Sequence, residues 1–202
     1  MTSPFLPFAL AAIVSVLIGV GVAMEPYSAG DVTIARALQS ALPDAEWWAT
    51  PISRLAPAPA NYYVMGLTAL LAFALAGFRG LLLAVAFIAL EQWGAESTKV
   101  WFSRLRPSPD LIAVVGTPRG FAFPSTTITF FAVTFGLLAV IAARVKQTPL
   151  ATGVLVTGSL MLALGCLARV ALGAHWPSDV ILTSVICLSW LWATARLVLP
   201  RR

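Results

Sequence analysis

Charged side chains are scarce in this sequence. Asp, Glu, Lys and Arg together make up 10% of the 202 residues, whereas 59% of the residues are hydrophobic. A soluble domain usually carries about 25% charged residues. The charges are too few to cover the surface of a water-soluble globule, and a chain this apolar does not stay disordered in water. The shortage therefore predicts that most of the chain lies in lipid.

Cysteine and histidine are also sparse, with two Cys and one His. Cys166 and Cys187 lie in apolar runs, so we interpret them as small buried side chains without a disulfide framework. No cluster with metal-ligand spacing is visible, and we expect neither a metal nor another cofactor. The net charge of +5 comes from basic residues dispersed among apolar runs. This dispersal excludes a groove for nucleic acid and fits attraction to anionic lipid headgroups.

Long hydrophobic runs dominate the sequence instead. A helix needs about 20 apolar residues to cross a bilayer, and six stretches meet or approach this length. They are residues 4–24, 62–78, 81–102, 125–143, 150–172 and 178–198. Short connections between some of them favour antiparallel neighbours. We predict an all-α fold, an integral membrane bundle of six helices in one domain over residues 1–202, with a first helix that is retained rather than cleaved as a signal peptide.

The basic residues also predict an orientation. If the N-terminus is cytoplasmic, six basic residues and no acidic ones fall on the inner side, as the positive-inside rule requires. These residues are Arg79, Arg144, Lys146, Arg196, Arg201 and Arg202. We expect a bacterial cytoplasmic membrane protein with both termini inside and segment 25–60 outside. Within that segment, residues 32–38 have an amphipathic pattern, which indicates an interfacial helix or, as the alternative, a packed loop.

Basic residues on the outer side are less expected. Five of them sit at the ends of predicted spans or in the connecting loop: Lys99, Arg104, Arg106, Arg119 and Arg169. Charges next to a span are costly unless they are paired or hydrated. One such residue is readily explained by a long side chain that reaches the interface. Five on one side favour a functional site.

Two local patterns define this site further. Lys99 precedes Arg106 by seven residues, so the two cations could share a helix face until Pro107 ends the helix. Pro124 and Ser125 open the fourth predicted span, and both residue types favour a helix start. The first turn of a helix offers unpaired backbone N–H groups to an anion. Both patterns are therefore suited to binding phosphate.

A third pattern adds a nucleophile. Arg169 is followed by His175, and Asp179 comes four residues later. A carboxylate at this spacing can accept a hydrogen bond from one imidazole nitrogen and leave the other free. Cations and backbone N–H groups would stabilise the charge on a phosphoryl group while the free nitrogen attacks phosphorus. We therefore interpret His175 as a nucleophile in phosphoryl transfer.

With these three patterns the sequence resembles the membrane-bound type 2 phosphatidic acid phosphatase superfamily, which is related to the vanadium haloperoxidases. The pattern of that family is K-x6-R-P, then P-S-G-H, then S-R-x5-H-x3-D. It is matched within residues 91–198 at Lys99, Arg106, Pro107, Pro124, Ser125, Arg169, His175 and Asp179. The resemblance implies six spans, a phosphatase-like core over about residues 62–198, and an outward-facing site that hydrolyses a lipid phosphate or diphosphate.

The resemblance also implies a role for each matched residue. It assigns phosphate binding to Lys99, Arg106, Ser125, Thr126 and Arg169. His175 would form a phosphohistidine, Asp179 would orient it, and water would release phosphate. The same residues would serve transfer to another acceptor, so a lipid phosphotransferase is an alternative.

Two positions depart from the family pattern. Ala168 replaces the serine before Arg169, and Thr127 replaces the histidine that protonates the leaving group. A missing general acid costs about 10²–10⁴-fold in rate. Three hypotheses remain open. The substrate is a polyprenyl diphosphate such as undecaprenyl diphosphate, whose leaving phosphate needs no acid. Glu96 is the donor, although its pairing with Lys99 is favoured. Or the protein binds phosphorylated headgroups without turnover.

A different class of function is a small transporter or a structural bundle. Transporters place their polar groups near the middle of the bilayer. Here the candidate residues gather at the outer boundary, which favours the phosphatase interpretation.

Overall fold

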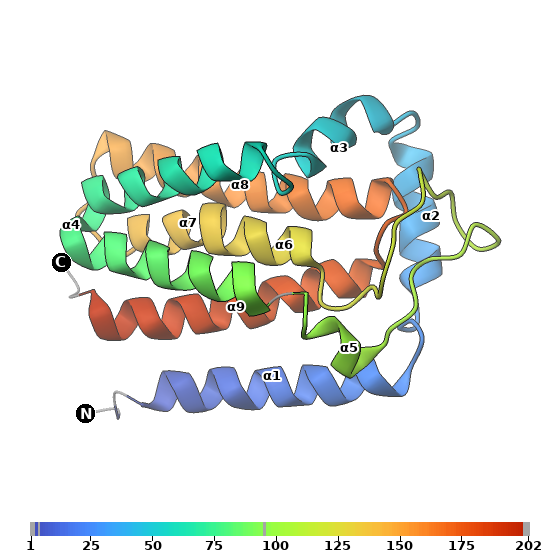
Figure 1. Cartoon of the computed structure of the whole chain (residues 1–202), viewed down its shortest axis with the longest axis horizontal. Helices are drawn as coiled ribbons and strands as arrows, with labels where there is room; N and C mark the ends of the chain where they lie inside the picture. The colour runs from blue at the N-terminus through green and yellow to red at the C-terminus, as the bar shows by residue number, and fades with distance from the viewer. Residues whose placement is uncertain (1–2, 4, 95, 200–202) are drawn as a thin grey trace.

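The computed structural model describes residues 3, 5–94 and 96–199, and each regular element in these ranges is helical (Figure 1). The elements are α1 (Leu6–Met24), α2 (Asp31–Ala41), α3 (Glu46–Ser53), α4 (Ala60–Gly94), α5 (Lys99–Phe102), α6 (Thr126–Phe131), the π-helix η1 (Ala132–Gly136), α7 (Leu137–Ala142), α8 (Pro149–Ala171) and α9 (Pro177–Val198). The all-α class predicted from the apolar runs is confirmed.

Four helices are long and apolar enough to cross a membrane, namely α1, α4, α8 and α9. A shorter apolar stretch, Thr126–Ala142, consists of α6, η1 and α7 in direct succession. Membrane helices of this kind agree with the shortage of charge in the sequence. The predicted number of six spans depends on how α4 is counted.

Helix α4 has 35 residues and contains a kink. Its backbone leaves the helical region at Ala76 (φ −137°) and at Gly77 (φ 62°), a positive angle that glycine adopts without a steric penalty. The ribbon reverses its direction there in Figure 1. The two arms of α4 therefore correspond to the predicted stretches 62–78 and 81–102.

The second arm of α4 is shorter than predicted. It ends at Gly94, and Lys99 begins the separate one-turn helix α5. That helix stops because Ser103 takes a left-handed conformation with φ 46°. Arg106 then follows in a non-helical segment. The prediction that Lys99 and Arg106 share one helix face is therefore wrong, because the contacts of the arginines after Ser103 outweigh local helix propensity.

The elements that carry the three sequence patterns gather at one end of the bundle. The start of α6, the end of α8 and the start of α9 lie together there, next to α2 and the loop 103–125 (Figure 1). The start of α1, the kink of α4 and the end of α9 lie at the opposite end. One end of the bundle thus holds the candidate site.

Segment 25–60 covers this end of the bundle and contains helices. The helix predicted within it is present as α2. Arg36 Nε donates to the Leu111 carbonyl at 2.7 Å, and Gln39 Nε2 donates to the Ala113 carbonyl at 2.8 Å. The segment is therefore a helical cap that holds the loop 103–125 in place.

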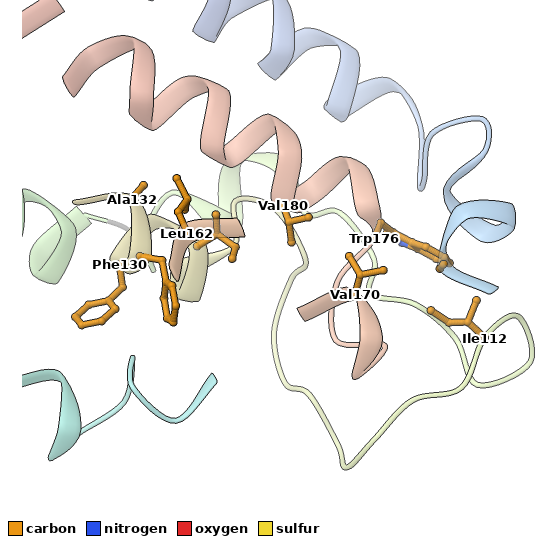
Figure 2. Close-up of a cluster of buried hydrophobic side chains, with 10 residues drawn as sticks. Ile112, Phe130, Ala132, Leu162, Val170, Trp176 and Val180 are labelled. Carbon is orange, nitrogen blue, oxygen red and sulfur yellow. The ribbon is translucent and has the colours of Figure 1, made fainter. Parts of the chain in front are cut away.

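A buried apolar cluster lies beneath the cap. Figure 2 shows part of it, with Ile112, Phe130, Ala132, Leu162, Val170, Trp176 and Val180 labelled. The indole of Trp176 is 1% exposed, and its Nε1 donates to the Leu105 carbonyl at 3.1 Å. Because Trp176 directly follows His175, this buried indole fixes the backbone beside the histidine.

Candidate active site

His175 lies in the short turn between α8 and α9. The Arg169 carbonyl closes this turn by accepting from the backbone N–H groups of Ala174 at 3.1 Å and His175 at 3.3 Å. Gly173 has φ 64°, and the backbone of Ala113 approaches it so closely that a Cβ atom would collide. The tight turn places the arginine and the histidine of the third pattern next to each other.

The Nε2 atom of His175 faces two polar side chains. Arg106 Nη1 lies 3.2 Å from it and Ser125 Oγ also 3.2 Å. A guanidinium can only donate, so Nε2 is the acceptor and the proton of the neutral ring is assigned to Nδ1. Burial, reinforced by the nearby cations, lowers the pKa of His175 well below its usual value of 6.5. Nε2 is therefore unprotonated at neutral pH.

The other ring nitrogen faces Asp179 without binding it. Nδ1 lies 3.7 Å from Asp179 Oδ2, which is beyond hydrogen-bond distance. Asp179 Oδ2 instead accepts from the backbone N–H of Trp176 at 2.9 Å, and Oδ1 accepts from Arg104 Nη1 at 2.7 Å. The hydrogen bond expected from the sequence spacing between Asp179 and His175 is thus not made, because Arg104 and the Trp176 N–H hold the carboxylate 3.7 Å from Nδ1.

Arg104 is a residue of this site that the sequence alone did not assign. It is 2% exposed, and its Nη2 also contacts Ser28 Oγ at 3.1 Å and Asp31 Oδ2 at 3.4 Å. Asp31 in turn accepts from Ser178 N at 2.8 Å and from Ser178 Oγ at 2.6 Å. The network joins α2 to the first turn of α9. The only signal in the sequence was the place of Arg104 among the outer cations.

Lys99, Arg106 and Arg169 converge on His175, since the charges of all three act on the imidazole. Burial lowers the pKa of Lys99 and also that of Arg106. Lys99 is 4% exposed, and its Nζ lies 3.1 Å from Glu96 Oε2, so the predicted pair is present. The three positive charges of Lys99, Arg106 and Arg169 repel one another, and a bound anion relieves this repulsion. The cluster is therefore suited to a phosphate.

The second pattern starts α6 at the same place. Ser125 is fully buried and caps the helix, because its Oγ accepts from a backbone N–H of the first turn at 3.4 Å. Its own backbone N–H donates to Thr183 Oγ1 at 3.1 Å. Thr126 and Thr127 follow in the first turn of α6. The serine thus directs the start of this helix toward His175.

A cavity of about 540 Å³ opens beside these residues. Thr126, Thr127 and Arg169 form part of its wall. Two carboxylates also line it, Glu91 from the second arm of α4 and Glu46 from the start of α3. The sequence patterns did not place either carboxylate at the site, because neither residue belongs to one of the three patterns.

No group of three or more His, Cys, Asp and Glu side chains that could hold a metal occurs among the residues described by the structure. Cys166 and Cys187 are half-buried free cysteines.

Comparison with known proteins agrees with this arrangement. A crystal structure of a transmembrane PAP2-type phosphatidylglycerolphosphate phosphatase from Bacillus subtilis has a similar fold, with a TM-score of 0.61 and 21% sequence identity over 98% of this chain and 94% of that one. Curated protein sequences gave no match. The family model of the PAP2 superfamily matches residues 80–202, which is more than half of the chain and contains all three patterns. The chain therefore belongs to the PAP2 superfamily.

Proposed function

We propose that this protein is an integral membrane phosphatase that hydrolyses a phosphorylated lipid through a phosphohistidine intermediate. The observation that carries the proposal is the environment of His175. Its Nε2 is unprotonated, contacts Arg106 and Ser125 at 3.2 Å, and faces a cluster of cations. Membership of the PAP2 superfamily and the shared fold with a lipid phosphate phosphatase support the same class of reaction.

The reaction proceeds in two steps. Nε2 of His175 attacks phosphorus, and the N–P bond forms as the bond to the leaving oxygen breaks. Lys99, Arg106 and Arg169 stabilise the charge on the equatorial oxygens, together with Ser125 and the backbone N–H of Thr126. Water then attacks phosphorus, and inorganic phosphate leaves as the electron pair returns to Nε2.

Asp179 supports the first step as a fixed charge. Attack through Nε2 makes the imidazole positive, and the carboxylate lies 3.7 Å from Nδ1. Arg104 and the Trp176 N–H hold the carboxylate, so it does not have to reorganise as the charge develops. Asp179 thereby favours the charged state of His175 and opposes its rotation.

The substrate class follows from the leaving group. Thr127 is too weak an acid to protonate an alkoxide. A lipid diphosphate releases a phosphorylated lipid, which leaves without a proton. A polyprenyl diphosphate such as undecaprenyl diphosphate therefore needs no general acid, and the residues of the three patterns suffice for its hydrolysis.

We further propose six membrane spans within one domain, counting the arms of α4 separately and α6–η1–α7 as one. The site then faces away from the cytoplasm of a bacterium, and both termini are cytoplasmic. The support is the positive-inside rule. Of the six basic residues predicted on the inner side, Arg79, Arg144, Lys146 and Arg196 lie at or near the end of the bundle opposite the site. Arg201 and Arg202 lie outside the residues that the structure describes.

The test is phosphate release by purified protein in lipid nanodiscs supplied with undecaprenyl diphosphate. The wild type should release phosphate, and His175→Ala should fall to background. Asp110→Asn, in an exposed loop, is the matched control and should keep full activity. Quenching a reaction with labelled substrate in base should leave phosphate on His175, because phosphohistidine is stable in base and labile in acid.

Equal background release by the wild type and His175→Ala would contradict the proposal. The remaining function would be binding of phosphorylated headgroups. An equilibrium titration with inorganic phosphate would then show binding by the wild type and its loss in Arg169→Gln.

A further inference from the structure

Glu91 lies where two cavities of different character meet. One is the cavity of about 540 Å³ beside Arg169 and Thr127. The other, of about 390 Å³, has a mostly apolar wall. Its apolar side chains come mainly from α4, α5, η1 and α9, among them Phe87, Trp101 and Ile186. Glu91 belongs to the walls of both. It is half-buried, and Gln92 Nε2 donates to its Oε2 at 2.6 Å.

The apolar cavity reaches the second sequence pattern. Pro124 and Thr183 line it, and Thr183 Oγ1 accepts from the backbone N–H of Ser125 at 3.1 Å. Ser125 Oγ is in contact with the nucleophilic Nε2 of His175. The apolar cavity is therefore separated from the nucleophilic Nε2 of His175 only by Ser125.

A phosphorylated lipid has the same two halves as this pair of cavities. Its phosphate suits the side of Arg169, and its hydrocarbon chain suits the apolar side. In a phosphomonoester the oxygen that joins phosphorus to carbon marks the boundary between these halves. With the substrate placed in this way, the bridging oxygen lies at the wall that Glu91 forms.

We infer that Glu91 is the proton donor to the leaving oxygen, and that this carboxyl group extends the substrate range to lipid phosphomonoesters. The inference rests on the proposed phosphatase function. A diphosphate substrate does not need this proton, whereas the alkoxide released from a monophosphate does.

The proton and electron balance of the step is complete. The Nε2 lone pair of His175 forms the N–P bond, the P–O bond breaks, and its electron pair goes to the leaving oxygen. That oxygen takes the proton of the Glu91 carboxyl, so the lipid leaves as an alcohol and Glu91 as a carboxylate. In the second step the carboxylate takes a proton from the attacking water, and Glu91 is ready for the next cycle.

Two other carboxylates are less suited to this role. Glu46 lines the polar cavity but is exposed and absent from the walls of the apolar cavity. Glu96 is 75% exposed at its side chain, pairs with Lys99 at 3.1 Å, and belongs to the wall of neither cavity. Only a group at the boundary between the two cavities meets the oxygen that joins phosphate to hydrocarbon.

The test compares two substrates of equal chain length, a polyprenyl monophosphate and the corresponding diphosphate. Glu91→Gln should lower kcat on the monophosphate about 10²-fold or more, with kcat on the diphosphate little changed. The alkaline decline of the wild-type monophosphate rate, caused by loss of the donor proton, should be absent in Glu91→Gln. Competitive inhibition by inorganic phosphate should be the same in both proteins. Glu46→Gln should change kcat on both substrates by the same factor.

Glu91→Asp is the second variant, for the case that the amide disturbs folding. It retains a carboxyl group and should keep part of the monophosphate activity that Glu91→Gln loses. The inference would be overturned if Glu91→Gln changed kcat equally on both substrates, or if Glu46→Gln selectively lost activity on the monophosphate. The proposed function would still be supported in that case by diphosphate hydrolysis that depends on His175. Absence of any release that depends on His175 would overturn both.

Discussion

Arg104 Nη1 donates to Asp179 Oδ1 over 2.7 Å, and neither side chain is exposed to solvent. The same guanidinium contacts Asp31 at 3.4 Å and so ties α2 to α9. Asp179 uses its second oxygen for the Trp176 N–H and lies 3.7 Å from the ring of His175. The position of the carboxylate beside the nucleophile is thus set by an arginine that follows α5, more than 70 residues earlier in the chain.

Replacing Arg104 should therefore impair catalysis through Asp179. We expect Arg104→Gln to lower kcat about 10²-fold with little change in KM, because a displaced charge beside His175 weakens the transition state without removing a phosphate ligand. Arg104→Lys should recover part of this loss, since one ammonium can still bind Asp179. Phosphate release by protein of verified monodispersity gives both constants. Full kcat in folded Arg104→Gln would show that Asp179 keeps its position without the arginine.

His175 should remain neutral at pH values at which an ordinary histidine becomes charged. Burial and nearby cations lower its pKa well below 6.5 in the folded state. The unfolded chain therefore binds a proton first as the pH falls through 6.5, and the contribution of this residue to stability decreases toward acid. The chain has one histidine, so imidazole carbon shifts in NMR spectra between pH 8 and 5 report His175 alone.

The denatured protein serves as the control for this titration and should titrate near 6.5. Inorganic phosphate should move the folded midpoint upward, because an anion among the cations favours imidazolium. A folded midpoint at or above 6.5 without phosphate would contradict the environment described for the ring.

The features that sequence could predict are those with a local cause. Apolar runs alone predicted the all-α class, and the amphipathic pattern of residues 32–38 indicated the helix that is present as α2. The break in the helix between Lys99 and Arg106 could not be predicted, because the contacts made by Arg104 decide the path of the chain after Ser103.

The role of Glu91 illustrates a second limit of the sequence. It belongs to none of the three sequence patterns, and nothing in its spacing connects it with Thr127. The connection arises only when the second arm of α4 packs beside α6 and a cavity forms between them. Two residues such as Glu91 and Thr127, which come together only through tertiary packing, leave no periodic signal in a single sequence.

The turn before His175 should tolerate no side chain at position 173. Gly173→Ala places a Cβ atom on a residue with φ 64° and against the backbone of Ala113. The left-handed conformation alone costs about 1–2 kcal/mol for other residues, and the collision also displaces His175. We expect a lower Tm and a large loss of phosphate release.

Gly153→Ala is the matched control, because a Cβ atom there meets nothing within 4 Å in the helix α8. It should leave activity intact and raise helix stability by about 0.5–1 kcal/mol. Thermal unfolding in detergent and the phosphate assay measure both variants. Similar effects of the two substitutions would show that the turn is not constrained.

Thr127 and Glu91 line the same cavity, so an acid placed at position 127 should replace one lost at position 91. We expect Thr127→His to restore monophosphate hydrolysis in the Glu91→Gln background by about 10-fold or more, since an imidazolium is a competent proton donor. The rescue should be strongest below about pH 6.5, where an ordinary imidazole is charged. Thr127→Asn supplies a polar group without a transferable proton and should give no rescue. Equal rates with histidine and asparagine at this position would mean that the leaving oxygen does not take its proton from this side of the cavity.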